Sequence, residues 1–205
     1  MGDTPKDWEI HPLRKLLTTH FPGDWGEERG AHMVAVLRST NLTNSGWLDV
    51  SDVAQRALAP ERAEALALRA GDILLERSGG GPKQPVGRVG FIDHDMSRHA
   101  FSNFIHLLRP NPRRIHPRYL GWLLWAVNRS GRILRLEQQT TQMRNLNFRE
   151  YLLMPLPVPP RPEQEGIAEM LDAIEASAER ARRVVAESGH LKAVLSRDLF
   201  TGQAR

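Results

Sequence analysis

The sequence contains no cysteine and only two tyrosines, and it has no apolar run long enough to span a bilayer. Without cysteine there are no disulfides and no thiolate metal sites. The N-terminus has no basic segment followed by an apolar run, so the sequence predicts no secretory signal. We therefore expect a cytoplasmic protein without a membrane span or a metal centre. A hydrophobic content of 40% is ordinary for a chain of 205 residues that buries one core.

Positive charge is concentrated in the middle of the chain. Residues 71–149 carry 13 Lys/Arg against 5 Asp/Glu, whereas acidic residues slightly outnumber basic ones in residues 1–70 and 161–205. A basic segment in an otherwise balanced chain is typical of a surface that binds a polyanion. The alternative is an arginine-rich surface that is merely solvated, and charge alone does not separate the two.

Motifs of catalysis are missing from the sequence. Residues 79–83 read Gly-Gly-Gly-Pro-Lys, but the Walker pattern is absent and Pro82 removes an amide that a phosphate cradle would need. The acidic residues and histidines between 93 and 99 have no ligand spacing, so a turn is predicted there. No serine lies in a nucleophile-elbow pattern. We therefore expect a non-catalytic chain. The enzymatic alternative is a stand-alone nuclease, which a DNA-cleavage assay would detect.

Periodicity and turn signals predict an α+β body with a small mixed or antiparallel sheet. Strands are expected at 33–37, 72–76, 86–92, 101–108 and 151–154, and helices at 60–70, from Pro117 onward and at 129–139. The strands at 72–76 and 86–92 are expected to form a hairpin around a flexible loop at 77–85.

The C-terminal part of the chain has a different pattern. Residues 155–164 are a proline-rich connector, which we predict to be extended and unable to join the interior of a sheet. About 35 residues with helical periodicity and no proline follow. We therefore expect a globular domain over residues 1–160 and a long helix over residues 161–205.

Apolar and small residues recur every three or four positions along this helix, which is the spacing of a coiled-coil seam. The predicted seam consists of Ile167, Leu171, Ile174, Ala178, Ala181, Val185, Leu191 and Leu195. The helix either folds back on its own domain or pairs with a helix of another chain. The stiff connector favours the second arrangement, because it directs the helix away from the domain.

Seven short motifs follow one another along the chain. They are Gly71–Leu74 with Glu76–Gly80, Val86–Val89, Asn103–Pro110, Pro117–Leu120, Gln142–Asn147, Pro157–Ala168 and Leu199–Gly202. Taken in this order, they resemble half of the specificity (S) subunit of type I restriction–modification systems. Each motif alone is a weak signal, but together they span nearly the whole chain in the order of the family.

The resemblance implies one target-recognition domain and one spacer helix, whereas full-length members carry two of each and read two half-sites of a split DNA sequence. A chain of this design would need a second copy. We therefore expect a homodimer with antiparallel helices and a bipartite, inverted-repeat site in double-stranded DNA. The chain would bind no cofactor itself and would guide a methyltransferase (M) subunit that uses S-adenosylmethionine. In a complex that also cleaves DNA, a restriction (R) subunit would join them. The alternative is a helix-mediated scaffold, or a degenerate remnant that no longer reads DNA.

Two polar loops supply the side chains that read base edges, since Arg pairs with guanine and Asn or Gln with adenine. The predicted DNA-binding residues of these loops are Arg38, Asn41, Arg77, Ser78, Gly79, Gly80, Lys83 and Gln84, and Arg98, which lies past the next turn, is a further candidate. The alternative for Arg77 and Ser78 is that they organise their loop. For Gln142, Asn145 and Asn147 such a structural role is favoured.

Overall fold

A computed structural model describes residues 5–81, 84–139 and 143–201 of the chain. The chain divides into two compact units, Met1–Gly166 and Ile167–Arg205, and each is described by itself. The last helix, α4 (Arg161–Phe200), begins in the first unit and continues through the second. The division of the protein into domains at residue 160 stays a prediction.

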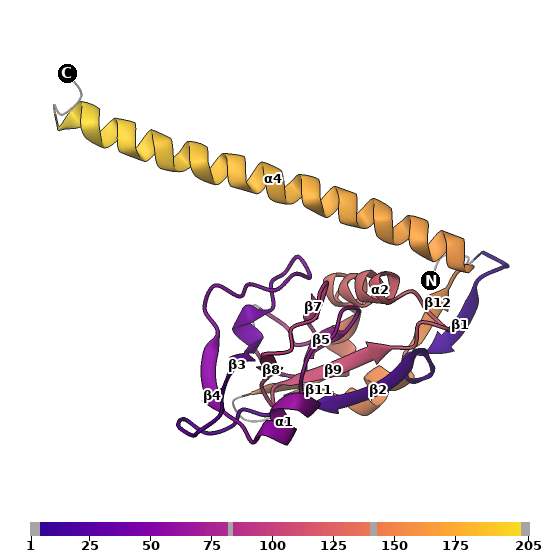
Figure 1. Ribbon diagram of the computed structural model, residues 1–205. Helices are drawn as coiled ribbons and strands as arrows, with labels where there is room; N and C mark the ends of the chain where they lie inside the picture. Colours follow the sequence, from indigo (N-terminus) through magenta and orange to yellow (C-terminus); the bar gives the residue numbers. More distant parts are fainter. Residues whose placement is uncertain (1–4, 82–83, 140–142, 202–205) are drawn as a thin grey trace. The chain divides into compact units, whose positions relative to one another are not determined.

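A four-stranded antiparallel sheet in the order β2-β9-β5-β7 forms the centre of the first unit (Figure 1). Its strands are β2 (Leu17–Pro22), β9 (Ile105–Pro110), β5 (Ile73–Glu76) and β7 (Val89–Phe91). β5 pairs with β9 on one side and β7 on the other, and all four of its residues are buried. Burial on both faces explains its continuous apolar run. The antiparallel pairing of β5 with β7 confirms the predicted hairpin.

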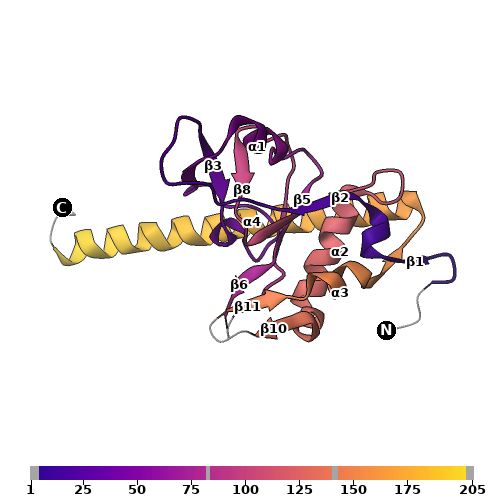
Figure 2. The ribbon, with the colours of Figure 1, turned by 90° about the horizontal axis from the view of Figure 1, so that it is seen from below.

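Three smaller sheets complete the first unit. β3 (Met33–Leu37) lies between β4 (Ala54–Ala57), which is antiparallel to it, and β8 (His99–Phe101), which is parallel. β11 (Arg144–Leu146) lies between β10 (Glu137–Gln139) and β6 (Ser78–Gly80), as Figure 2 shows. β1 (Glu9–Pro12) pairs with β12 (Pro155–Val158). Small antiparallel and mixed sheets with helices confirm the predicted α+β class.

The helices follow local signals in the sequence. Besides α4 they are α1 (Pro60–Ala65), α2 (Pro117–Arg129) and α3 (Phe148–Leu153), with the 3₁₀ turns η1 (Leu13–Leu16), η2 (Ser39–Asn41) and η3 (Arg132–Leu136). α2 begins where predicted, because Pro117 suits the first helical position. It packs on β7, where a Cβ at Gly121 would lie 2.9 Å from the Phe91 ring. The buried Trp122 ring meets Phe91 edge-on at 5.0 Å.

One of the two predictions near the connector is wrong. The strand expected at 151–154 is helix α3, because the Asn147 side chain caps it by accepting a hydrogen bond from the Glu150 N–H (3.3 Å). The proline-rich connector is extended, as predicted, and its residues Pro155–Val158 form β12 of a two-stranded sheet, which has no interior. Pro155 and Pro157 lie two residues apart, so they remove donors from one edge of the strand and leave the other edge to pair with β1.

Three further expectations are corrected by tertiary contacts. The helix expected at 60–70 ends at Ala65, because Leu66 and Leu68, two residues apart, are both buried in the core. The strand expected at 101–108 is two strands, β8 and β9, with a turn between them. The helix expected at 129–139 is interrupted at Gly131, whose φ of 74° lies in the left-handed region, and continues as η3 and β10.

The predicted long C-terminal helix is confirmed as α4, and its first turn is anchored in the first unit. The buried Gln164 side chain donates to the Pro159 carbonyl (2.8 Å) and accepts from the His116 N–H (2.7 Å) at the start of α2. Arg161 donates to the Pro112 carbonyl (3.0 Å). One glutamine therefore ties the start of α4 to the start of α2. Among the described helices, none combines the length and the hydropathy that crossing a membrane requires.

Candidate functional site

The two polar loops singled out from the sequence meet at one hollow of about 460 Å³. The Ser39 hydroxyl in η2 donates to the Ser78 carbonyl in β6 (3.5 Å). A third segment, the turn between β8 and β9, supplies Asn103 and Phe104 to the same hollow. Other lining residues are Trp25, Arg38, Thr40 and Gly79. The sequence analysis identified Arg38 and Gly79 but missed Trp25 and Phe104. The position of each aromatic residue directly after a turn is the sequence signal that could have indicated them.

Phe104 is fixed in place by the backbone of the neighbouring loop. Its carbonyl accepts hydrogen bonds from the N–H groups of Arg77 (2.8 Å) and Ser78 (3.2 Å). The Arg77 carbonyl accepts from the Leu146 N–H (2.8 Å) in β11. Gly79 has a φ of 106°, which L side chains rarely adopt. Residues 78–80 are therefore a strand held from two sides, which corrects the flexible loop expected at 77–85.

A buried ion pair supports the loop that carries Arg38. Glu76 is 1% exposed and accepts from Arg88 Nε (2.9 Å) and Arg88 Nη2 (2.8 Å). The same guanidinium donates to the carbonyls of Ser39 (2.9 Å) and Leu42 (2.6 Å). A carboxylate at the end of a buried strand needs a cation. A glutamate at the end of an apolar strand is therefore a sequence signal for a nearby cation, and it could have indicated the role of Arg88.

Asn41 and Arg38 have different positions in this loop. Asn41 is 4% exposed, and its side chain accepts from the Arg38 N–H (2.7 Å) and donates to the carbonyls of Asp49 (2.7 Å) and Asp52 (2.8 Å). Both of its amide hydrogens are used, so the geometry favours loop organisation over the predicted base contact. Arg38 Nη2 pairs with the Asp52 carboxylate (2.8 Å), while Arg38 Nε is buried and has no hydrogen-bond partner.

Arg77 is exposed at the mouth of the β6 loop. Its side chain forms no ion pair or hydrogen bond with any residue that the structure describes. Ser78 is buried, and its hydroxyl donates to Asn145 Oδ1 (2.6 Å), which supports the loop-organising alternative for Ser78. Gly80 lies opposite Arg144 in the ladder of β6 with β11. The side chain of Arg77 is therefore available to a ligand.

The remaining predicted residues are not all brought together. Gln84 is exposed, and its main chain exchanges two hydrogen bonds with Gly81 (2.8 and 3.1 Å). Arg98 is exposed but lines a separate hollow of about 650 Å³ beside His32 and His99. Lys83 lies outside the described residues, as does Gln142. Among the described residues, no group of three His, Asp or Glu side chains is placed to hold a metal ion.

Exposed arginines gather around η3. Arg132 and Arg135 lie three residues apart, and side chains with this spacing share a face of a 3₁₀ helix. Arg129 ends α2 and Arg149 lies in α3, which packs against η3. Within the described chain, none of the four has an ion-pair partner. Because η3 leads directly into β10, this basic surface adjoins the sheet that contains β6.

His106 lies in β9 and is 5% exposed. Its ring centroid is 4.0 Å from that of Phe148 and 6.4 Å from that of His20. Burial, the positive charge of Arg77 and the proximity of His20 lower the pKa of His106 to about 4. His106 is therefore neutral at pH 7, and its Nδ1 has no hydrogen-bond partner.

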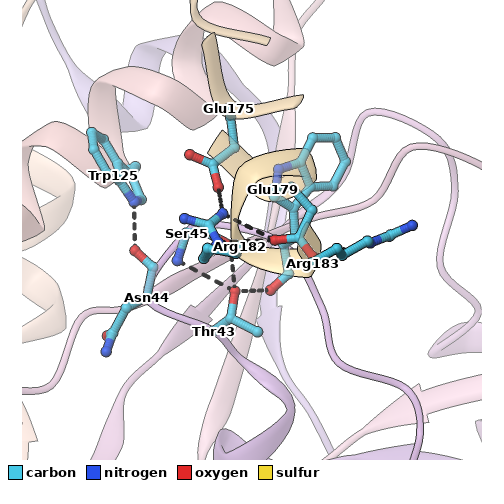
Figure 3. Close-up of polar contacts among 9 residues, drawn as sticks. Thr43, Asn44, Ser45, Trp125, Glu175, Glu179, Arg182 and Arg183 are labelled. Carbon is cyan, nitrogen blue, oxygen red and sulfur yellow. Dashed lines mark hydrogen bonds and ion pairs between the residues drawn. The ribbon is translucent and has the colours of Figure 1, made fainter. Parts of the chain in front are cut away.

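A second contact fixes the segment that follows η2. Figure 3 shows Trp125 of α2 donating its Nε1–H to the Asn44 carbonyl (2.9 Å). Thr43 Oγ1 bonds the Ser45 hydroxyl (2.8 Å) and donates to the Trp47 carbonyl (2.6 Å). The polar loop is therefore rigid at both of its ends, which suits a surface that must hold side chains in register with a ligand.

On α4 the polar and apolar side chains have separate roles. Arg182 pairs with both Glu175 and Glu179, and Arg183 pairs with Glu179 (3.4 Å), all within the helix (Figure 3). The predicted seam residues Ile174, Ala181, Val185, Leu191 and Leu195 are exposed, and Ile167, Leu171 and Ala178 are partly exposed. The charged residues thus satisfy one another, while the apolar seam has large side chains in contact with water.

The fold is an α+β unit followed by a long C-terminal helix. A family described as the type I restriction modification DNA specificity domain matches residues 6–187. The chain belongs to this family, which confirms the resemblance seen in its motifs and supports a role in DNA sequence specificity.

Relatives and solved structures agree with this assignment. A protein of Methanocaldococcus jannaschii, provisionally named as the specificity subunit of the type I restriction enzyme MjaX, is 21% identical over 98% of this chain and 47% of its own length. The HsdS subunit from Thermoanaerobacter tengcongensis has a TM-score of 0.61 and 16% identity, over 93% of this chain and 48% of that one. The S subunit from M. genitalium has a TM-score of 0.63 and 14% identity, and the match covers 100% of this chain and 48% of that one. The structures show a shared fold, and the chain spans about half the length of these proteins.

Proposed function

We propose that this chain is a DNA-binding specificity subunit that reads a base sequence and does no chemistry itself. The observation that carries the proposal is the convergence of three loops on one hollow, beside the exposed Arg77, whose side chain has no partner among the described residues. An arginine on a rigid loop can donate two hydrogen bonds to a guanine edge, which is the commonest specific contact in the major groove. Membership of a DNA specificity family supports this reading.

Affinity for the duplex comes from the basic surface around η3. Arg129, Arg132, Arg135 and Arg149 have no acidic partner in the described part of the chain, so nothing competes with phosphate for their charge. Phosphate contacts position a protein on DNA without reading sequence. We propose that this surface contacts the phosphate backbone of DNA and that the loops around the hollow contact the bases.

The exposed seam of α4 binds the α4 helix of a second copy. A helix of 40 residues is about 60 Å long at about 1.5 Å per residue, and a long helix with a bare apolar seam is poorly stable in water alone. Ala178 and Ala181 in the middle of the seam allow a close approach of the partner. An antiparallel pair with two-fold symmetry would present two recognition domains to an inverted, bipartite site.

Chemistry in such a complex belongs to other subunits. A methyltransferase (M) subunit that uses S-adenosylmethionine would modify the bound site, and a restriction (R) subunit would join where the complex also cleaves DNA. In this scheme the present chain binds no cofactor and only determines which DNA sequence the complex binds.

Selection from a library of random duplexes at moderate salt tests the proposal. We expect enrichment of one sequence whose two halves are inverted and separated by a fixed gap. Salt-sensitive binding to all duplexes alike would contradict sequence reading, and no binding at any salt would favour the scaffold alternative. The purified chain with divalent metal should leave the selected duplex intact, and cleavage would favour a nuclease.

A further inference from the structure

The hollow between the three loops is lined by aromatic surface. Trp25 and Phe104 contribute it, and Gly79 contributes no side chain that would fill the hollow. Arg38 also lines the hollow, but Arg38 Nε is buried and out of reach of a ligand, so a ligand in the hollow meets the aromatic walls rather than this N–H.

The main chain that carries Phe104 is held in place. Phe104 is 38% exposed, and the turn that carries it is bonded through the Phe104 carbonyl to two successive N–H groups, those of Arg77 and Ser78. Apolar area that is held exposed in the unbound protein contributes to binding when a ligand covers it. The bonded N–H of Arg77 also places the hollow directly beside the side chain that we assign to base contact.

One base edge of DNA matches this aromatic surface. In the major groove, thymine presents an apolar C5-methyl group, whereas the other bases present only hydrogen-bonding groups there. An apolar wall therefore favours thymine, because another base would place a donor or an acceptor against carbon without a partner.

We propose that the hollow receives the C5-methyl edge of one thymine in the target, with Phe104 and Trp25 against the methyl group. This assignment rests on the proposed function, because it assumes that the loops around Arg77 face the bases. It makes Phe104 a specificity-determining residue of the chain.

Deoxyuridine tests this assignment, because it differs from thymidine only by the missing methyl group. Each thymine of a duplex that binds tightly in the selection is replaced in turn, and affinity is measured for the wild-type chain and for Phe104→Ala. At one thymine the wild type should lose about fourfold in affinity, which corresponds to about 0.8 kcal/mol for one buried methyl group. Phe104→Ala should bind the thymine duplex more weakly and should bind the thymine and uracil duplexes equally.

Leu153→Ala is the matched control, because Leu153 is 49% exposed and lies in α3, outside the lining of the hollow. This variant should keep the fourfold sensitivity to uracil. Thermal unfolding shows whether Phe104→Ala is folded. If it is not, Phe104→Leu replaces it in the same comparison. A smaller difference in affinity between the thymine and uracil duplexes than in the wild type then supports the assignment.

Two results would overturn the inference. One is a wild-type chain that binds its selected duplex specifically but is insensitive to uracil at every position, which leaves the proposed function intact. The other is a sensitivity to uracil that is unchanged in the Phe104 variant. Failure of the proposed function looks different, because no sequence is then selected at all.

Discussion

Arg88 holds Glu76 through two hydrogen bonds of 2.9 and 2.8 Å, and the same guanidinium donates to the main chain of Ser39 and Leu42. One side chain thus neutralises a carboxylate at the end of the central strand β5 and positions the loop that carries Arg38. The core and the recognition surface therefore depend on the same ion pair.

Arg88→Ala should lower the free energy of unfolding by about 3–5 kcal/mol, because Glu76 is left charged and buried without a partner. Urea unfolding measures the change. The double variant Arg88→Met, Glu76→Leu should be less destabilised than the single variant, since it removes the buried charge. A loss below about 1 kcal/mol in Arg88→Ala would show that the pair does not stabilise the loop.

Arg132→Ala and Arg135→Ala should weaken binding to selected and scrambled duplexes by the same factor. Each lost phosphate contact should also reduce the slope of log K against log salt by about 0.9. Salt titrations of fluorescence anisotropy measure both effects. Arg14→Ala is the control, because Arg14 is exposed in η1 and is outside the basic surface around η3. A loss confined to the selected duplex would instead assign these arginines to base reading.

His106 should make the protein less stable as the pH falls from about 6.5 to about 4. In this window the unfolded chain binds a proton at His106 that the folded chain does not, so the free energy of unfolding declines. The decline due to this residue is at most about 3 kcal/mol, since one pKa unit corresponds to about 1.4 kcal/mol. Urea unfolding of His106→Gln should show a shallower dependence on pH, and parallel curves for the two proteins would refute the assignment.

Ile174→Asp should abolish pairing of α4, because it places a charge in the apolar seam, where Ile174 is 58% exposed. Analytical ultracentrifugation should show the mass of a dimer for the wild type and of a monomer for this variant, with an unchanged circular dichroism spectrum for the sheets. Ala176→Asp adds the same charge about 200° around the helix and should remain dimeric. An unchanged mass for Ile174→Asp would contradict the pairing.

Local signals predicted the elements that depend on local interactions. The apolar run of β5, the start of α2 at Pro117 and the repeating seam of α4 could all be read from neighbouring residues. β6 could not, because Ser78–Gly80 has no strand pattern and is ordered by pairing with β11, more than sixty residues away in sequence. β12 could not be predicted as a strand for a similar reason, since it pairs with β1, which lies far away in sequence, while its prolines face the unpaired edge.

The candidate site was predicted in part. Both polar loops were identified, and Arg38 and Gly79 lie at the same hollow. The burial of Asn41 could not be predicted, because a buried amide that organises a loop and an exposed amide that reads a base look alike in sequence. Phe104 was missed because its position depends on hydrogen bonds from Arg77 and Ser78, which no local pattern reveals.

The most direct test of sequence reading compares Arg77→Ala with the wild type on two duplexes, the selected sequence and a scrambled one of equal length. Loss of a bidentate base contact should lower affinity for the selected duplex by roughly 5- to 150-fold, equivalent to about 1–3 kcal/mol, and should change affinity for the scrambled duplex only slightly. An equal loss on both duplexes, or no loss on either, would contradict the account.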